Sequence, residues 1–157
     1  MKRILMIITA MGCMTILFAF AHPYYEANSE TAMGDISAKQ QDDDDMRTKM
    51  EELNFTEISL EVQYQDRKEY EAEIDADPNE PIEAEVEDEL NNVYLRGKEA
   101  FDELFPKVKK LNLTSNSSKQ EVIDQILEAF ELPTDYVDFD VEIRFKDGKK
   151  IDIEDRK

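Results

Sequence analysis

The sequence predicts an α+β fold: an antiparallel sheet of two repeated β-hairpins plus an extra strand, with about three helices on one face. Two observations support this prediction. Apolar and polar residues alternate strictly in residues 58–64 and 70–74, and again in residues 139–145 and 150–153, which is typical of half-buried strands. Between these stretches, apolar residues recur every three or four positions, which is typical of amphipathic helices.

The N-terminus has the features of an export signal. Lys2 and Arg3 precede an unbroken apolar run that ends in Ala19, Phe20 and Ala21, a small-x-small pattern suited to signal peptidase. We therefore expect residues 1–21 to be a signal peptide, cleaved between Ala21 and His22.

Two alternatives to cleavage remain open. An uncleaved anchor is the first, although the apolar run Ile4–Ala21 is at the short edge of what spans a bilayer. Lipidation at Cys13 is the other alternative, although Ala10 stands where a lipobox has Leu and the residues after Cys13 are apolar. In all three cases the positive charges stay inside, so the rest of the chain is expected in the cell envelope or outside the cell. It would touch the membrane only through this N-terminal segment.

Residues 22–45 are polar, lack apolar periodicity and end in four consecutive aspartates. This composition predicts a disordered acidic tether, with the aspartates as solvated charge. A short helix is expected to begin at Met46, with Met46, Met50 and Leu53 as its apolar stripe. The folded domain is therefore expected to span residues 46–157.

The two alternating stretches each predict a hairpin. Apolar residues of 58–64 share a face with those of 70–74 only if Gln65–Arg67 forms a three-residue loop, because a two-residue loop would bury glutamates. The C-terminal hairpin repeats the pattern, with Gly148 at the left-handed position of its turn. Superimposing Ile58 on Phe139 aligns the two hairpins and places Arg67 where the second has Gly148.

Two helices are expected between the hairpins, at residues 97–111 and 118–130. Pro106 interrupts the first. Ser118 and Glu121 fit a capping box at the start of the second. Each helix carries one apolar stripe, so each should pack on a single face of the sheet.

Residues 82–90 are ambiguous between a strand and a helix. Ile82, Ala84 and Val86 alternate as in a strand, whereas Ile82, Val86 and Leu90 also fit a helix. We favour a strand paired with residues 70–74, because the intervening residues 75–81 resemble a turn.

Charge excludes several functions. The 157 residues include 19 Lys+Arg and 38 Asp+Glu, which gives a net charge of −19. This excess of acid argues against nucleic-acid partners, since phosphate binding needs a basic surface. With one Cys and one His, the chain lacks the residues for a disulfide framework, a Cys/His zinc site or a Ser-His or Cys-His catalytic pair. No catalytic residue, metal ligand or cofactor is therefore assigned.

Residues 69–89 contain no Lys or Arg and many acids. The alternation places six glutamates on one face, which is the candidate interaction face: Glu69, Glu71, Glu73, Glu83, Glu85 and Glu87. Asp75, Asp77 and Asn79 begin like an EF-hand loop, but Glu80 replaces its glycine and Val86 its final glutamate, so we reject that loop. Weak calcium binding at the cell surface stays open, as does a carboxylate pair that hydrolyses cell-wall glycan.

Three segments resemble the YusW-like family of secreted and lipoprotein-type envelope proteins from Bacillus relatives. They are LRGKEAFDEL at 95–104, SKQEVIDQILEAFEL at 118–132 and FKDG at 145–148. The resemblance implies an architecture and a location but no catalytic residues. The helix-then-hairpin unit is also similar, more loosely, to PepSY-type envelope modules, and such a likeness does not fix function. We therefore expect a non-enzymatic, exported interaction module whose partner is an envelope protein or a wall component.

Overall fold

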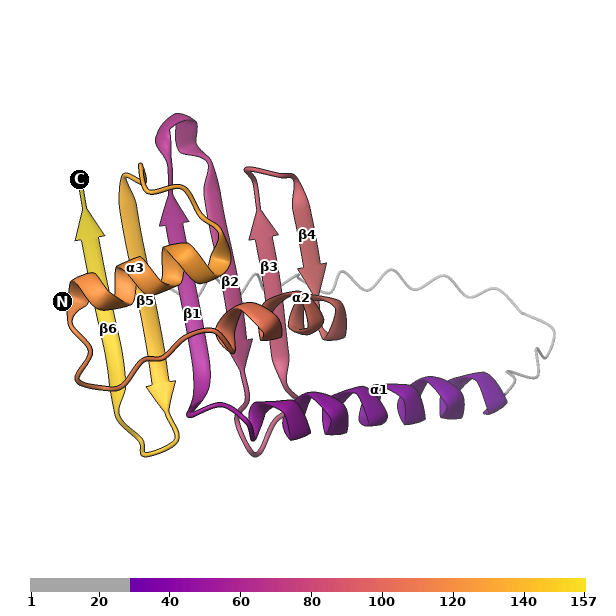
Figure 1. Cartoon of the computed structure of the whole chain (residues 1–157). Coiled ribbons are helices and arrows are strands. Elements are labelled where there is room, and N and C mark those ends of the chain that lie inside the picture. Colours follow the sequence, from indigo (N-terminus) through magenta and orange to yellow (C-terminus); the bar gives the residue numbers. More distant parts are fainter. Residues whose placement is uncertain (1–28) are drawn as a thin grey trace, which may run out of the picture.

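The structure is a computed structural model that describes residues 29–157. Its strands are β1 (Phe55–Gln63), β2 (Glu69–Asp75), β3 (Glu83–Asp88), β4 (Val93–Arg96), β5 (Asp138–Phe145) and β6 (Lys150–Arg156), and its helices are α1 (Ser29–Met50), α2 (Lys98–Val108) and α3 (Lys119–Phe130). The strands form one antiparallel sheet in the order β4-β3-β2-β1-β5-β6 (Figure 1). The predicted α+β class is confirmed.

Both predicted hairpins are present, and each has a three-residue turn. In the first, the Tyr64 amide donates to the Lys68 carbonyl at 2.8 Å across the turn Gln65–Arg67. In the second, the Phe145 amide donates to the Lys149 carbonyl at 2.8 Å. The three-residue loop keeps the apolar faces together, as predicted, because it pairs Val62 with Tyr70 rather than with a glutamate.

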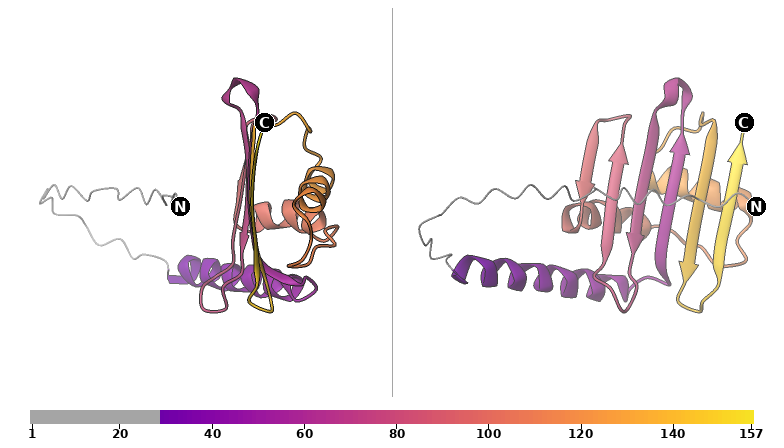
Figure 2. Two further views of the ribbon diagram at one scale, coloured as in Figure 1. Left: turned by 90° about the vertical axis from the view of Figure 1, so that its left-hand side faces the viewer. Right: turned by 180° about the vertical axis from the view of Figure 1, so that it is seen from behind.

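The two hairpins meet along their first strands. β1 pairs with β5, with Leu60 opposite Val141 and Ile58 opposite Ile143. The four strands of the repeated unit therefore lie side by side at the centre and one edge of the sheet, with the two hairpin turns at opposite ends (Figures 1 and 2).

The remaining two strands extend the sheet beyond β2. Residues 83–88 form β3, so the strand interpretation is confirmed and the helix alternative is wrong; Val86 pairs with Ala72. β4 was not expected, and the sheet has six strands where the sequence predicted five. A tight turn connects β3 to β4, in which the Asp88 carboxylate accepts the Asn91 backbone amide at 2.9 Å. With only four residues, β4 is too short to show a clear alternation.

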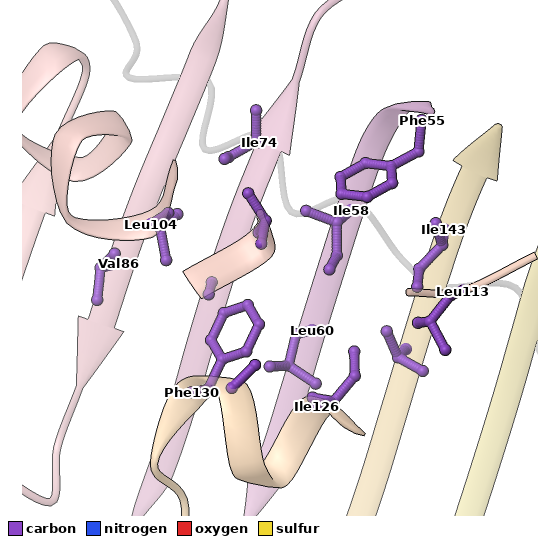
Figure 3. Packing of buried hydrophobic residues seen from close by; sticks show 14 of the residues in the cluster. Phe55, Ile58, Leu60, Ile74, Val86, Leu104, Leu113, Ile126, Phe130 and Ile143 are labelled. Carbon is purple, nitrogen blue, oxygen red and sulfur yellow. The ribbon is translucent and has the colours of Figure 1, made fainter. Parts of the chain in front are cut away.

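The hydrophobic core lies between the sheet and the helices α2 and α3. Phe101 of α2, Ile126 of α3 and Phe139 of β5 are each 0% exposed, and Figure 3 shows the side chains of the helices pointing toward those of the strands. Burying each such side chain contributes about 1.5–3 kcal/mol. The capping box of α3 is confirmed: the Ser118 hydroxyl accepts the Glu121 amide at 3.3 Å.

Helix α1 corrects two expectations. It begins at Ser29 rather than Met46, so residues 29–45 are helical where a disordered tether was expected. It also crosses the end of the sheet, so only α2 and α3 cover the face (Figure 2). Met46 and Met50 are buried as predicted. Ion pairs one turn apart, Arg47 with Asp43 at 2.8 Å and Lys49 with Asp45 at 2.9 Å, support the helix where its apolar stripe is short.

Contacts with loops hold the C-terminal part of α1 at this end of the sheet. The Asp43 carboxylate accepts the Ile82 backbone amide at 2.7 Å. The Arg47 guanidinium donates to the Asp77 carbonyl at 3.2 Å, and the Lys146 ammonium donates to the Met50 carbonyl at 3.0 Å. The sequence interpretation of the aspartates as solvated charge is therefore wrong for Asp43.

The expected signal cleavage between Ala21 and His22 and the alternative lipidation at Cys13 fall outside the described residues. Within residues 29–157, no helix combines the length and apolar character needed to cross a bilayer.

Candidate functional site

The sheet has one covered face and one open face. Helices α2 and α3 lie on the same side of the sheet (Figure 2). We call the opposite side the open face. Side chains alternate between the two, so the buried residues of each strand point to the helices and the exposed residues point to the open face.

The predicted interaction glutamates all lie on the open face. β2 carries Glu69, Glu71 and Glu73, and β3 carries Glu83, Glu85 and Glu87. Backbone pairing places Glu71 opposite Glu87 and Glu73 opposite Glu85. The structure therefore brings the six residues together, and their role in binding stays a prediction.

These glutamates belong to a longer row that the sequence interpretation missed. Consecutive backbone pairs align one acidic residue from each of five strands, and we call this the carboxylate row: Glu154, Asp140, Glu61, Glu71 and Glu87. Neighbouring strands lie about 4.8 Å apart, so the row is a line of regularly spaced carboxylates across the sheet. Tyr94 of β4 continues the line beyond Glu87, and its side chain is 60% exposed.

Basic residues of the open face stand toward its edges. On β4, Arg96 pairs with Glu85 and lies 3.6 Å from Glu87. On the other side, Arg144 pairs with Glu57 at 2.6 Å and Arg156 with Asp138 at 2.9 Å. The ion pairs therefore neutralise the periphery of the open face.

The centre of the open face has no such neutralisation. Within residues 38–157, no Lys or Arg lies at ion-pair distance from any of four acidic side chains: Glu61, Glu71, Glu73 and Asp140. Like charges directly opposite each other across a strand pair destabilise a sheet. The central carboxylates therefore repel one another.

Burial and this repulsion raise the pKa values of the central carboxyls. Burial, a hydrogen bond with Glu69 and the charges of Glu69 and Glu71 raise the pKa of Glu61 to about 7. Burial, followed by neighbouring carboxylates, also raises the pKa of Glu71, Glu73 and Asp140 above their ordinary values. At neutral pH the row therefore contains a group that is partly protonated, which few exposed glutamates are.

A shallow hollow lies beside the carboxylate row. Ser59 has the shortest polar side chain among its neighbours, and the glutamates around it leave a depression of about 140 Å³. Its rim is acidic: Glu61, Glu71, Glu73 and Glu85. Pockets that enclose small molecules measure about 300–1,000 Å³, so this hollow suits one projecting group of a larger partner.

The acids of the β2–β3 turn have a structural role. Asp75 accepts the Asp77 backbone amide at 3.0 Å, and Asp77 accepts the Asn79 amide at 2.7 Å. These bonds shape the turn in which an EF-hand loop was considered and rejected. Among residues 38–157, whose side chains the structure describes, no three His, Cys, Asp or Glu side chains converge as a metal site. The calcium-responsive alternative stays a prediction.

Sequence reasoning could have found part of the carboxylate row. Glu61 occupies a polar position of the first alternating stretch, so its place on the open face follows from the period of two. Its neighbour Asp140 lies in a distant segment, and only the pairing of β1 with β5 brings the two together. Tyr94 lies on the strand that was not expected.

Comparisons with known proteins found a family model and a relative that match the chain. Residues 56–147 match the family model described as YusW-like protein. Over 102 residues, the chain is 32% identical to the uncharacterized protein YusW of Bacillus subtilis (strain 168), an alignment that covers 64% of this chain and 70% of that protein. No solved structure matches the chain, and the looser PepSY resemblance stays a prediction.

Proposed function

This chain belongs to the YusW-like family, and we propose that it is an exported cell-envelope protein whose open face binds a basic polypeptide segment without catalysing a reaction. One observation carries the proposal: the carboxylate row crosses five strands with no basic residue in it. A face of this kind complements a chain of Lys or Arg side chains.

Energetics support a cationic partner. Repulsion among Glu61, Glu71 and Asp140 lowers the stability of the free domain. A bound cation removes that repulsion, so part of the interaction energy comes from relief of a cost already present in the free protein. Electrostatic complementarity also accelerates association.

Shape supports an elongated partner over a small molecule. The open face is a sheet surface whose hollow at Ser59 measures only about 140 Å³. An extended or helical segment laid along the row would place basic side chains near Glu61, Glu71 and Glu87 in turn. The exposed ring of Tyr94 then offers a cation–π contact at the end of the row.

Octalysine is the probe that tests this proposal. We expect it to bind the purified chain at low ionic strength and to weaken steeply with added salt, measured by calorimetry. The double variant Glu71→Gln and Glu87→Gln should bind at least about tenfold more weakly, since two unit charges leave the row.

The matched control for this double variant is Asp124→Asn with Glu128→Gln, the same charge change on the exposed surface of α3. Equal affinity of the two double variants would sink the proposal, as would no binding to the unmodified chain at low salt. Binding to an amine-bearing wall polymer but not to octalysine would replace the polypeptide with a wall component.

Hydrolysis of cell-wall glycan is the second candidate, favoured by one observation. The pKa of Glu61, about 7, suits a general acid, and the neighbouring Glu71 could serve as the second carboxylate. Release of reducing sugar from peptidoglycan, lost in Glu61→Gln, would support this candidate and contradict a non-enzymatic module. We rank glycan hydrolysis second because the hollow at Ser59 is shallow.

Export is also part of the proposal, supported by the N-terminal sequence. Mass spectrometry of the native protein separates its forms. A mature chain that begins at His22 supports cleavage after Ala21, and a diacylglycerol adduct on Cys13 supports lipidation. An intact N-terminus on protein from the cytosol would overturn export.

A further inference from the structure

We propose that the β5–β6 turn and the linker between α2 and α3 form a second binding site, which takes a sugar or polyol that carries an anionic group. Both segments lie at the end of the sheet where β5 ends (Figure 1) and line a cavity of about 470 Å³. This volume is within the range of about 300–1,000 Å³ that is typical of small-molecule pockets. The site goes beyond the proposed function, because it uses other residues than the carboxylate row and is tested without a basic partner.

Asn54, which precedes β1, joins the two walls of the cavity. Its side-chain amide donates to the Leu113 carbonyl of the linker at 2.9 Å, and its own carbonyl accepts the Lys146 backbone amide of the turn at 3.0 Å. The Leu113 side chain is buried in the core, which anchors the linker. The walls are therefore in place before a ligand arrives, and binding does not bear the cost of ordering them.

The linker wall offers polar groups that the protein leaves unused. The Thr114 hydroxyl accepts the Asn116 backbone amide at 3.3 Å, and the Ser117 hydroxyl accepts the Thr114 amide at 3.2 Å, so this short segment has a defined shape. Within residues 38–157, the Ser115 hydroxyl and the Asn116 side-chain amide have no hydrogen-bond partner, and both residues line the cavity. A hydroxyl and an amide can each donate and accept, which suits the hydroxyls of a sugar or polyol.

Lys146 supplies a positive charge at the turn wall. Its ammonium donates to the Met50 and Glu51 carbonyls, each at 3.0 Å. These bonds fix the ammonium in place and leave one of its three hydrogens for a ligand. In the part of the chain whose side chains are described, no carboxylate lies at ion-pair distance from Lys146, whereas Lys149 and Asp147 neutralise each other at 2.9 Å. The fixed charge of Lys146 therefore favours an anionic group on the ligand.

An apolar surface completes the cavity. Phe145, the last residue of β5, lines it and is otherwise buried. A free inorganic anion has no apolar surface to place against this ring, whereas a sugar or polyol has C–H groups. The combination of unused polar groups, a fixed cation and an aromatic ring therefore indicates a sugar phosphate or polyol phosphate rather than phosphate alone.

Glucose-1-phosphate is the probe, and amide NMR spectra of the purified chain are the measurement. We expect saturable shifts of the amides of residues 113–117 and 145–149, with a Kd of about 1 mM or below. Glucose and inorganic phosphate should each bind at least about tenfold more weakly, because each lacks part of the recognised chemistry. Equal affinity for phosphate would overturn the sugar or polyol ligand, and equal affinity for glucose would overturn the anionic group. No saturable shift up to about 20 mM glucose-1-phosphate would overturn the site.

The repeated hairpins supply a matched pair of variants. Lys146→Gln introduces the residue that the first hairpin has at the equivalent position, Gln65. This change should weaken glucose-1-phosphate binding about fivefold or more and leave glucose binding unchanged, because only the charge is lost. The control is Lys68→Gln, which makes the same charge change at the hairpin turn on the opposite end of the sheet and should leave both affinities unchanged.

A second variant is needed, because Lys146→Gln also removes two hydrogen bonds to the end of α1. Asn116→Ala removes a side chain that has no partner within residues 38–157, so the melting temperature should not change. Binding of glucose-1-phosphate and of glucose should both weaken about threefold, since a hydrogen bond to a hydroxyl is lost. If Asn116→Ala and Lys146→Gln both bind glucose-1-phosphate as tightly as Lys68→Gln does, the site is elsewhere and the proposal fails.

Discussion

Glu61 of β1 lies directly opposite Glu71 of β2, and burial together with neighbouring carboxylates raises the pKa of both side chains. A like-charged pair at the centre of a sheet opposes folding. Protonation removes that opposition, which makes the stability of this domain depend on pH in an unusual direction.

Stability should rise as the pH falls from about 8 to about 5. The pKa values of four carboxyls are raised in the folded state, so the folded chain binds more protons than the unfolded chain in this range: Glu61, Glu71, Glu73 and Asp140. The contribution of each carboxyl is fully present below its ordinary pKa and is lost as the pH rises through its raised folded-state pKa, which for Glu61 is about 7. Urea unfolding at half-unit pH steps measures it. A domain that is more stable at pH 8 than at pH 5.5 contradicts this prediction.

Acid should destabilise the domain below about pH 4. Hydrogen bonds from the side chains of Lys98 and Lys119 lower the pKa of Asp102 and Asp155, respectively. Because these carboxylates are stabilised in their charged form, their contribution is present above their ordinary pKa and lost as the pH falls through the folded value. The same urea series should therefore show a maximum between about pH 4.5 and 6, and a monotonic curve down to pH 3 would argue against these ion pairs.

The two related turns predict opposite effects of glycine. Arg67 has φ 61° and Gly148 has φ 80°, both in the left-handed region. A side chain makes this backbone conformation unfavourable, and glycine has none. Arg67→Gly should therefore raise the free energy of unfolding by up to about 1 kcal/mol. Gly148→Ala imposes the same conformation on alanine and should lower it by about 1 kcal/mol. Chemical denaturation of both variants checks the pair, and effects of the same sign would show that the turns are not equivalent.

Asp43 should anchor α1 to the β2–β3 loop. Its carboxylate accepts the Ile82 amide and pairs with Arg47, so Asp43→Ala should cost about 1–2 kcal/mol and speed hydrogen exchange in α1. Asp42→Ala is the matched control, because among the described residues the Asp42 side chain makes neither a hydrogen bond nor an ion pair. Identical hydrogen exchange in the two variants would mean that the Asp43 carboxylate is solvated and does not anchor α1.

Ser118 should contribute measurably as the N-cap of α3. Its hydroxyl accepts the Glu121 amide, and Ser118→Ala should destabilise the domain by about 1 kcal/mol. Ser118→Asp preserves a capping oxygen and should restore most of that stability. Thermal unfolding compares the three proteins, and an unchanged melting temperature in Ser118→Ala would show that water replaces the cap without cost.

Local pattern was sufficient for much of the fold. Alternation located both hairpins and required the turn Gln65–Arg67, because a one-residue change of register would have exchanged Tyr70 for a glutamate in the core. The same reasoning placed Glu71 and Glu73 on one face. It failed for β4, whose few residues show no clear period, and for the extent of α1, which depends on ion pairs and loop contacts.

The sequence by itself determined both hairpins, β3, α2 and α3, the face that each of their side chains occupies and the acidic character of the open face, because these depend on periodicity within short segments. Only the tertiary structure decided which carboxylates are neighbours. Glu61 stands between Glu71 and Asp140 because β1 pairs with β2 on one side and with β5 on the other. That order joins segments far apart in the chain, and the packing of the whole sheet against α2 and α3 selects it.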